Sequence, residues 1–133
     1  MAREDRSSKL VRRLLRGLRG LEGVEESPSQ FSDRPAWWVN GKEIAHLDPD
    51  GALDLRLGRE AIRARRAQLK ADPRVTLRRS GADWLSVRVA SAADLAWALE
   101  LCELAAAAHR APPGRPPVPP PAGPALERRR RWH

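Results

Sequence analysis

Hydrophobic positions in the first part of the chain recur with helical spacing. From Ser8 to Leu21, leucine or valine returns every three to four residues and arginines fill the positions between. Gly17 and Gly20 interrupt this segment, and each weakens an isolated helix by about 1 kcal/mol relative to alanine. We therefore predict an amphipathic basic helix that packs against the rest of the protein. The alternative is a helix that binds a membrane surface or nucleic acid.

The segment WWVNGKEIAHLDPDGALDLRL, residues 37–57, alternates between apolar and polar positions and contains two turn signals. Asn40-Gly41 predicts a two-residue type I′ hairpin turn, because both residues tolerate a positive φ. Residues 48–51, DPDG, predict a type I turn with proline second and glycine fourth. The pattern therefore predicts a meander of three strands, preceded by a short possible edge strand that ends near Phe31.

Pairing across these two turns assigns the strand residues to faces. With unbroken registers, Trp37 pairs with Ile44, and His46 pairs with Leu53. The apolar face then consists of Trp37, Val39, Ile44, His46, Leu53, Leu55 and Leu57, and the opposite face of Trp38, Glu43, Ala45, Asp54 and Arg56. We interpret His46 as a histidine at the rim of the core, with its ring nitrogens satisfied by backbone or water. A one-residue bulge would reverse this assignment.

The second half of the chain repeats the alternation of helix and strand. Residues 59–71 predict a helix with Ile62 and Leu69 inward and a stripe of cations outward, and residues 74–79 and 84–89 predict two strands. Ser91 followed by Asp94 predicts the start of a last helix, which runs from about 92 to 108. This helix is apolar almost all round, so it either lies between the sheet and the first helix or buries one stripe in a homodimer.

These elements predict the α+β fold class, in the order α-β-β-β-α-β-β-α. The expected architecture is a five-stranded antiparallel or mixed sheet with helices packed on one face, in a single domain over residues 6–110. Residues 111–133 contain most of the 12 prolines. Such a composition favours extended polyproline II and cannot bury a core, so we predict a disordered Pro-rich tail with a basic end.

The net charge of +8 comes from the two ends of the chain. Residues 1–23 carry seven basic against three acidic residues, residues 110–133 carry six against one, and residues 24–109 carry twelve against thirteen. The basic run Arg128, Arg129, Arg130 and Arg131 therefore predicts weak, nonspecific nucleic-acid binding through the termini. No apolar run is long enough for a membrane span and no signal peptide is apparent, so we expect a cytoplasmic protein. Abundant Ala and Arg with few Lys and no Tyr favour a bacterial source.

Catalytic and metal-binding patterns are incomplete in this sequence. His46, His109 and His133 are scattered and Cys102 is the only cysteine, so no zinc spacing exists. There is no phosphate loop and no nucleophile elbow, and we predict no cofactor. The outward sheet face offers a candidate ligand site of cations and aromatics, because such groups stack on and neutralise planar or anionic molecules. Its residues are Trp38, Asp54, Arg56, Arg78, Trp84 and Arg88.

The order of elements around NGKEIAHLDPDGALDLRL resembles the small bacterial proteins of the luciferase-named domain family and, more distantly, the MmcQ/YjbR-like fold. The resemblance runs from about Trp37 to Ala106. It rests on Gly41, Glu43, Ile44, Ala45, His46, Gly51, Leu53, Leu55, Leu57 and Trp84. Members of the luciferase-named family often carry two further histidines, at positions that are Asp48 and Asp54 here. The resemblance to the YjbR-like fold implies a double-wing mode of DNA binding.

Three functional hypotheses follow from these observations. The first is a noncatalytic binding or interaction module that uses the Trp/Arg face of the sheet. The second is a nucleic-acid-binding module of the double-wing type. The third is an enzyme in which His46 acts together with Asp48 or Asp54.

Overall fold

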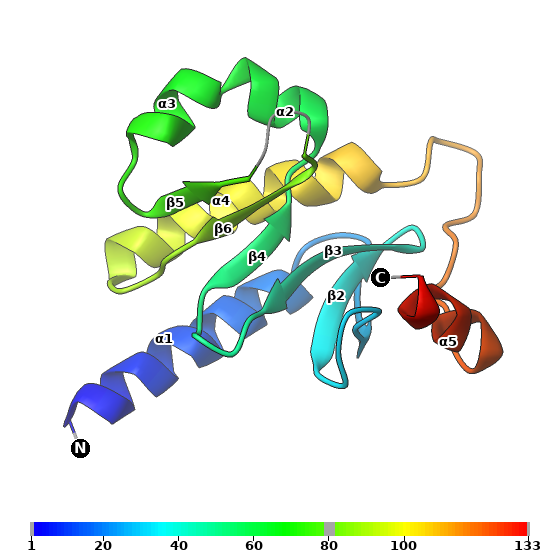
Figure 1. The fold of residues 1–133 in the computed structure, drawn as a ribbon, viewed down its shortest axis with the longest axis horizontal. Helices are drawn as coiled ribbons and strands as arrows, with labels where there is room; N and C mark the ends of the chain where they lie inside the picture. The colour runs from blue at the N-terminus through cyan, green and yellow to red at the C-terminus, as the bar shows by residue number, and fades with distance from the viewer. Residues whose placement is uncertain (1, 79–81, 133) are drawn as a thin grey trace.

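The computed structural model describes residues 2–78 and 82–132, and their fold is drawn in Figure 1. One sheet and five helices make up the α+β architecture that the sequence predicts. In chain order the elements are α1 (Ala2–Arg19), β1 (Val24–Pro28), β2 (Pro35–Val39), β3 (Lys42–Leu47), β4 (Leu53–Arg56), α2 (Arg59–Ala64), α3 (Arg66–Ala71), β5 (Val75–Leu77), β6 (Trp84–Val87), α4 (Ala92–His109) and α5 (Pro124–Arg131).

The sheet has six strands in the order β1-β2-β3-β4-β6-β5, and every neighbouring pair is antiparallel. The prediction of five strands is therefore wrong by one. The additional strand is β1, which corresponds to the short possible edge strand predicted before the meander but ends at Pro28 instead of near Phe31. Its sequence VEESP has neither a clear alternation nor high strand propensity. It forms because its backbone pairs with β2 along its whole length, from Val24 opposite Val39 to Pro28 opposite Pro35.

The main core lies between one face of the sheet and the helices α1 and α4, which lie behind the sheet in Figure 1. Leu10, Leu14 and Leu18 of α1 are buried there at the helical spacing read from the sequence. Helix α4 contacts α1 as well as β3 and β4, so both of its apolar stripes find partners. The two helices approach closely at Gly17, where an added Cβ would lie 2.5 Å from Leu99 Cδ2.

The middle helical segment is divided in two. The sequence predicts one helix over residues 59–71, whereas α2 and α3 meet at Arg65, which has φ −111° and ψ 13°. Ile62 and Leu69 are nevertheless both buried, as predicted. The predicted N-cap of α4 is confirmed, because the Ser91 side chain accepts a hydrogen bond of 3.1 Å from the Asp94 amide.

The predicted register of β2, β3 and β4 is wrong by one residue on each side of β3. The β2–β3 register shifts between Trp37 and Trp38, which leaves Ile44 as an extra residue, so Trp37 pairs with Ala45. On the other side His46 pairs with Asp54, not with Leu53. The DPDG turn accounts for the second shift, because Gly51 adopts a positive φ of 88° and adds a third loop residue.

These shifts reverse the faces of two strand residues. Ala45 belongs to the main core, whereas His46 lies on the face of Trp38, opposite α1 and α4. The interpretation of His46 as a residue on the apolar face is therefore wrong. Ile44 and Ala45 both join the core, since the bulge lets two successive residues of β3 be buried.

The C-terminal segment also differs from its prediction. The sequence predicts a disordered tail over 111–133, whereas residues 124–131 form α5, which lies near β2 on the opposite side of the sheet from α4 (Figure 1). Helix formation and docking follow from Leu126, which packs on Ala36 and Trp38 in a second, small hydrophobic cluster. The expectation that helices cover only one face is therefore also wrong. No helix within the described ranges is long and apolar enough to cross a membrane.

Candidate ligand site on the outer sheet face

The outer face is the side of the sheet opposite α1 and α4, and it has two halves. The covered half lies over β1 and β2 and the Asn40–Gly41 turn, where α5 packs on Trp38. The open half lies over β3, β4 and β6. A pocket of about 340 Å³ opens there, lined by Phe31, His46, Arg56, Arg78 and Trp84.

A row of buried and partly buried polar side chains forms the floor of the open half. His46 Nδ1 lies 2.8 Å from Glu43 Oε2, and His46 Nε2 lies 3.0 Å from Asp54 Oδ2. The pairing of His46 with Asp54, and of Asp54 with Ser86, places these side chains side by side across three strands. Ser86 Oγ donates a hydrogen bond of 2.5 Å to Asp54 Oδ1.

Glu43 is fully buried and accepts three hydrogen bonds. Besides His46, its donors are the Ser29 hydroxyl at 2.8 Å and the Gln30 amide at 2.7 Å. Both donors belong to the loop between β1 and β2. A buried carboxylate without such partners would reduce the stability of the fold strongly. The loop between β1 and β2 is therefore needed to hold Glu43 in the site.

His46 carries a carboxylate on each ring nitrogen, which favours the doubly protonated, positively charged ring. Burial by itself lowers the pKa of His46, but the hydrogen bond and charge of Glu43 and the charge and hydrogen bond of Asp54 outweigh it. The net result is a pKa raised above the ordinary value of 6.5. The two carboxylates therefore favour the charged form of the ring between them.

Three rings form the wall of the pocket. The centroids of His46 and Trp84 are 5.3 Å apart, and the ring of Phe31 lies 5.5 Å from His46 and 5.7 Å from Trp84, edge-on to the indole. Distances of this size are those of favourable aromatic contacts. Phe31 is 42 % exposed, so this apolar wall faces solvent.

Two arginines flank the rings. Arg56 is the cross-strand partner of Trp84, and its guanidinium carbon lies 5.0 Å from the centre of the indole ring. Arg78 lies 3.6 Å from Asp54 Oδ2, with its own side chain half exposed. Arg56 has no hydrogen-bond or ion-pair partner among the described residues, although its Nε is buried. Burial lowers the pKa of Arg56, and Asp83 and Glu43 counteract this through their charges.

Four of the six predicted ligand residues meet in this region. Arg56, Arg78 and Trp84 line the pocket, and Asp54 supports it from below. Trp38 is only 1 % exposed, because α5 covers it. Arg88 is exposed beyond the end of β6 and does not line the pocket.

Several residues of the candidate site were not among the predicted site residues, and Glu43 and Phe31 are the two with the most contacts to His46 and the pocket wall. Glu43 was assigned to the outward face and belongs to the family resemblance, and a buried carboxylate three residues before a histidine is a signal that could have linked it to His46. Phe31 offered no signal, since it lies in a loop whose position depends on long-range contacts. Asp48 is separate from the site, since its carboxylate accepts hydrogen bonds from the Asp50 and Ala52 amides of its own turn.

The basic run at the C-terminus is divided by its helix. Arg129 Nη1 donates to the Gly41 carbonyl at 2.9 Å, and Arg130 donates to the carbonyls of Ser29 and Ser32. Arg128 and Arg131 are exposed. Arg131 Nε also donates to the Glu127 carbonyl, at 3.5 Å. Nucleic-acid binding through the whole run therefore stays a prediction in which three of the four side chains already have partners.

The polar row is built around the ring of His46, and its side chains are not arranged as the ligands of a metal ion would be. Glu43 and Asp54 bind opposite nitrogens of the imidazole ring, so their oxygens do not converge on one point with a ring nitrogen. Among residues 2–78 and 82–132, no group of three or more His, Cys, Asp or Glu side chains is arranged to hold a metal ion.

Comparison with known proteins supports the resemblance read from the sequence. Residues 41–105 match the family model described as the luciferase domain, and this span contains β3, β4 and β6 with His46, Asp54 and Trp84. No curated protein and no solved structure gives a significant match. Over residues 41–105 the chain is therefore similar to the luciferase domain family, and this matched region includes most of the residues that line the pocket.

Proposed function

We propose that this protein is a noncatalytic binding module that takes a small planar anion in the pocket on the open half of the outer face. One observation carries the proposal: two arginines, a histidine held between two carboxylates, and two further aromatic rings line the same pocket. The rings offer surfaces for stacking, and the cations attract a carboxylate or phosphate group.

The charge of the site favours an anion. When the His46 ring is protonated, His46, Arg56 and Arg78 contribute three positive charges and Glu43 and Asp54 contribute two negative ones, so the net charge of these five groups is +1. Both carboxylates are already engaged by His46. The guanidinium of Arg56 lacks such a partner in the described part of the chain, and an anion would supply it.

The state of His46 supports binding over catalysis. A general base needs an unprotonated nitrogen within hydrogen-bond reach of the substrate proton. Here both ring nitrogens are held by carboxylates at 2.8 and 3.0 Å, and the pKa of the ring is raised. The family name gives no support for light emission, because no step of such a reaction is represented in these residues.

Titration calorimetry with phenyl phosphate tests the proposal, because this probe combines one ring with one anionic group. We expect binding by the wild type and at least about tenfold weaker binding by Arg56→Gln, since a charge-assisted hydrogen bond is lost. Arg63→Gln is the matched control, because Arg63 is an exposed arginine of the neighbouring helix α2. Benzyl alcohol, which lacks the charge, and acetate, which lacks the ring, should both bind much more weakly than phenyl phosphate.

Two results would contradict the proposal. Equal affinities of the wild type and Arg56→Gln for phenyl phosphate would exclude the pocket as the anion site. Release of phenol by the wild type but not by His46→Ala, with binding preserved, would favour the enzyme that the sequence left as an alternative.

A further inference from the structure

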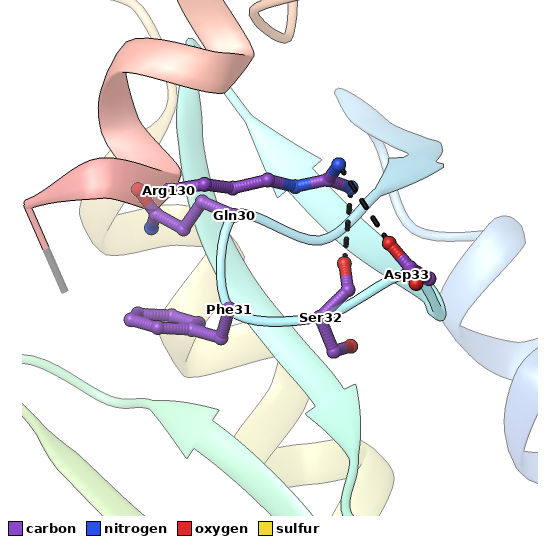
Figure 2. A pocket seen from close by; sticks show the side chains of 5 residues that line it. All are labelled: Gln30, Phe31, Ser32, Asp33 and Arg130. Atoms are coloured by element: carbon purple, nitrogen blue, oxygen red, sulfur yellow. Dashed lines mark hydrogen bonds and ion pairs between the residues drawn. The ribbon is translucent and has the colours of Figure 1, made fainter.

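Helix α5 reaches the loop that builds the pocket. Its apolar anchor is Leu126, which is buried on Trp38 and Ala36. Its polar anchor is Arg130. The guanidinium donates from Nε and Nη2 to the Ser29 carbonyl at 3.2 and 3.1 Å, and from Nη2 to the Ser32 carbonyl at 3.0 Å. Figure 2 shows this arginine extended along the loop, toward Ser32 and Asp33.

The same loop supplies the opposite side of the site. The Ser29 hydroxyl and the Gln30 amide hold Glu43, and Glu43 in turn holds His46. Phe31, the next residue, contributes its ring to the pocket wall. In Figure 2 the ring of Phe31 points away from the guanidinium of Arg130. One short loop therefore connects α5 with both the floor and the wall of the pocket.

We propose that α5 is a brace for the pocket loop, so that docking of α5 and binding of a ligand in the pocket stabilise one another. The ligand part of this inference rests on the proposed function. The brace itself rests on the contacts of Arg130, because carbonyls held by a guanidinium fix the backbone of residues 29–32 in the conformation that aims its donors at Glu43. By linkage, the coupling acts in both directions.

The attachment of α5 makes such coupling feasible. Residues 112–119 are exposed, and an anchor of this stretch is the hydrogen bond of 2.8 Å from the Val118 amide to Asn40 Oδ1. The cluster of Leu126 with Ala36 and Trp38 is separate from the main core. Local opening of α5 therefore costs less than unfolding of the domain, as for other peripheral segments.

Residue-resolved amide hydrogen exchange on the full chain tests the brace without any ligand. In Arg130→Gln, we expect the Gln30 amide, which donates to Glu43, to exchange about tenfold faster or more, because the charge-assisted bonds to the loop are lost. Leu126→Ala should have the same effect through the other anchor. Arg128→Gln, an exposed change on the same helix, should leave Gln30 unchanged, and the Leu85 amide of β6 should be unchanged in all three variants.

Phenyl phosphate then tests the coupling. Saturation with this probe should slow exchange of the Glu127 amide, which donates to the Gly123 carbonyl at the start of α5, in the wild type. Arg130→Gln should bind the probe severalfold more weakly than Arg128→Gln does. Unchanged Gln30 exchange in both Arg130→Gln and Leu126→Ala would overturn the brace, whatever the probe does. Faster Gln30 exchange in a protein that does not bind the probe would support the brace and overturn the proposed ligand instead.

Discussion

The two halves of the outer face differ in what they bury. On the covered half, the large apolar side chain of Trp38 lies beneath Leu126 of α5 and is 1 % exposed. On the open half, Trp84 lies beside charged Arg56 and Arg78 and borders a pocket. The same face of the sheet therefore presents one tryptophan, on β2, as packing surface and another, on β6, as pocket wall.

This difference suggests how the face is divided between stability and binding. Arginines on the covered half use their charge on backbone carbonyls of the protein, as Arg129 does with Gly41 and Arg130 with Ser29. On the open half, Arg56 has no such acceptor in the described part of the chain. Buried donors without acceptors reduce stability, so their retention is typical of functional positions.

The largest expected effect is on the residue that connects the two halves. Glu43→Ala removes the carboxylate that accepts from Ser29, Gln30 and His46, and leaves the imidazolium with one partner. Breaking such a buried pair costs about 3–5 kcal/mol of unfolding free energy. Urea denaturation measures this, with exposed Glu25→Ala as control. A cost below about 1 kcal/mol would mean that the polar row is not a structural connection.

Matched arginine substitutions should have opposite effects on the two halves. Arg130→Met, on the covered half, should lower stability by about 1.5–3 kcal/mol because hydrogen bonds from a charged donor are lost. Arg56→Met, on the open half, should leave stability unchanged or raise it by up to about 1 kcal/mol, because a buried unpaired donor is removed. Thermal and urea unfolding of both variants provide the measurement. Equal losses of unfolding free energy in the two variants would mean that the arginines of the two halves do not differ in their contribution to stability.

Two hairpin glycines give a smaller, paired test of the tail contacts. Gly41 and Gly51 both have a positive φ, of 76° and 88°, where alanine costs about 1–2 kcal/mol. An added Cβ at Gly41 would also lie 2.7 Å from Val118 Cγ1, whereas at Gly51 nothing lies within 4 Å. Gly41→Ala should therefore be the more destabilising change, and Val118→Ala should remove the excess. Equal losses of stability in Gly41→Ala and Gly51→Ala would mean that Val118 does not pack closely against the Asn40–Gly41 turn.

The pH dependence of stability is expected to be a small effect, because it involves a single proton. The raised pKa of His46 means that its contribution to stability is full below the ordinary pKa of 6.5 and is lost as the pH rises through the raised value. Unfolding free energy measured between about pH 6 and 9 should therefore decline in this range more in the wild type than in His46→Gln. His109→Gln should retain the decline. A flat wild-type profile would contradict the charged state of His46.

The sequence predicted the elements better than their faces. Periodicity located the helices because Leu10, Leu14 and Leu18 must share one face, and Asn40-Gly41 located a turn because its residues tolerate a positive φ. The face of His46 could not be predicted, because it depends on a bulge at Ile44 and on a third loop residue at Gly51, and both change register without changing the alternating pattern.

The candidate site was predicted only in part for a related reason. Arg56, Arg78 and Trp84 were identified from strand alternation, which is a local signal. Phe31 and α5 reach the outer face through contacts that are distant in sequence, such as Arg130 with Ser29. Proline-rich composition predicted a disordered tail, but Leu126 packs on Trp38 and Arg130 donates to the Ser29 carbonyl, and neither contact has a local signal in the sequence.

The irregular hairpins have a consequence for how such a domain can diversify. In a strand the side chains alternate, so shortening or lengthening a turn by one residue exchanges the whole set of side chains between the two faces. Here the three-residue loop that ends at Gly51 pairs His46 with Asp54. Deletion of one loop residue would instead set His46 opposite Leu53 and dismantle the polar row without altering any of its members. In this fold, the length of a turn decides which residues become cross-strand neighbours. Substitutions change the side chains at those positions but not which positions are paired.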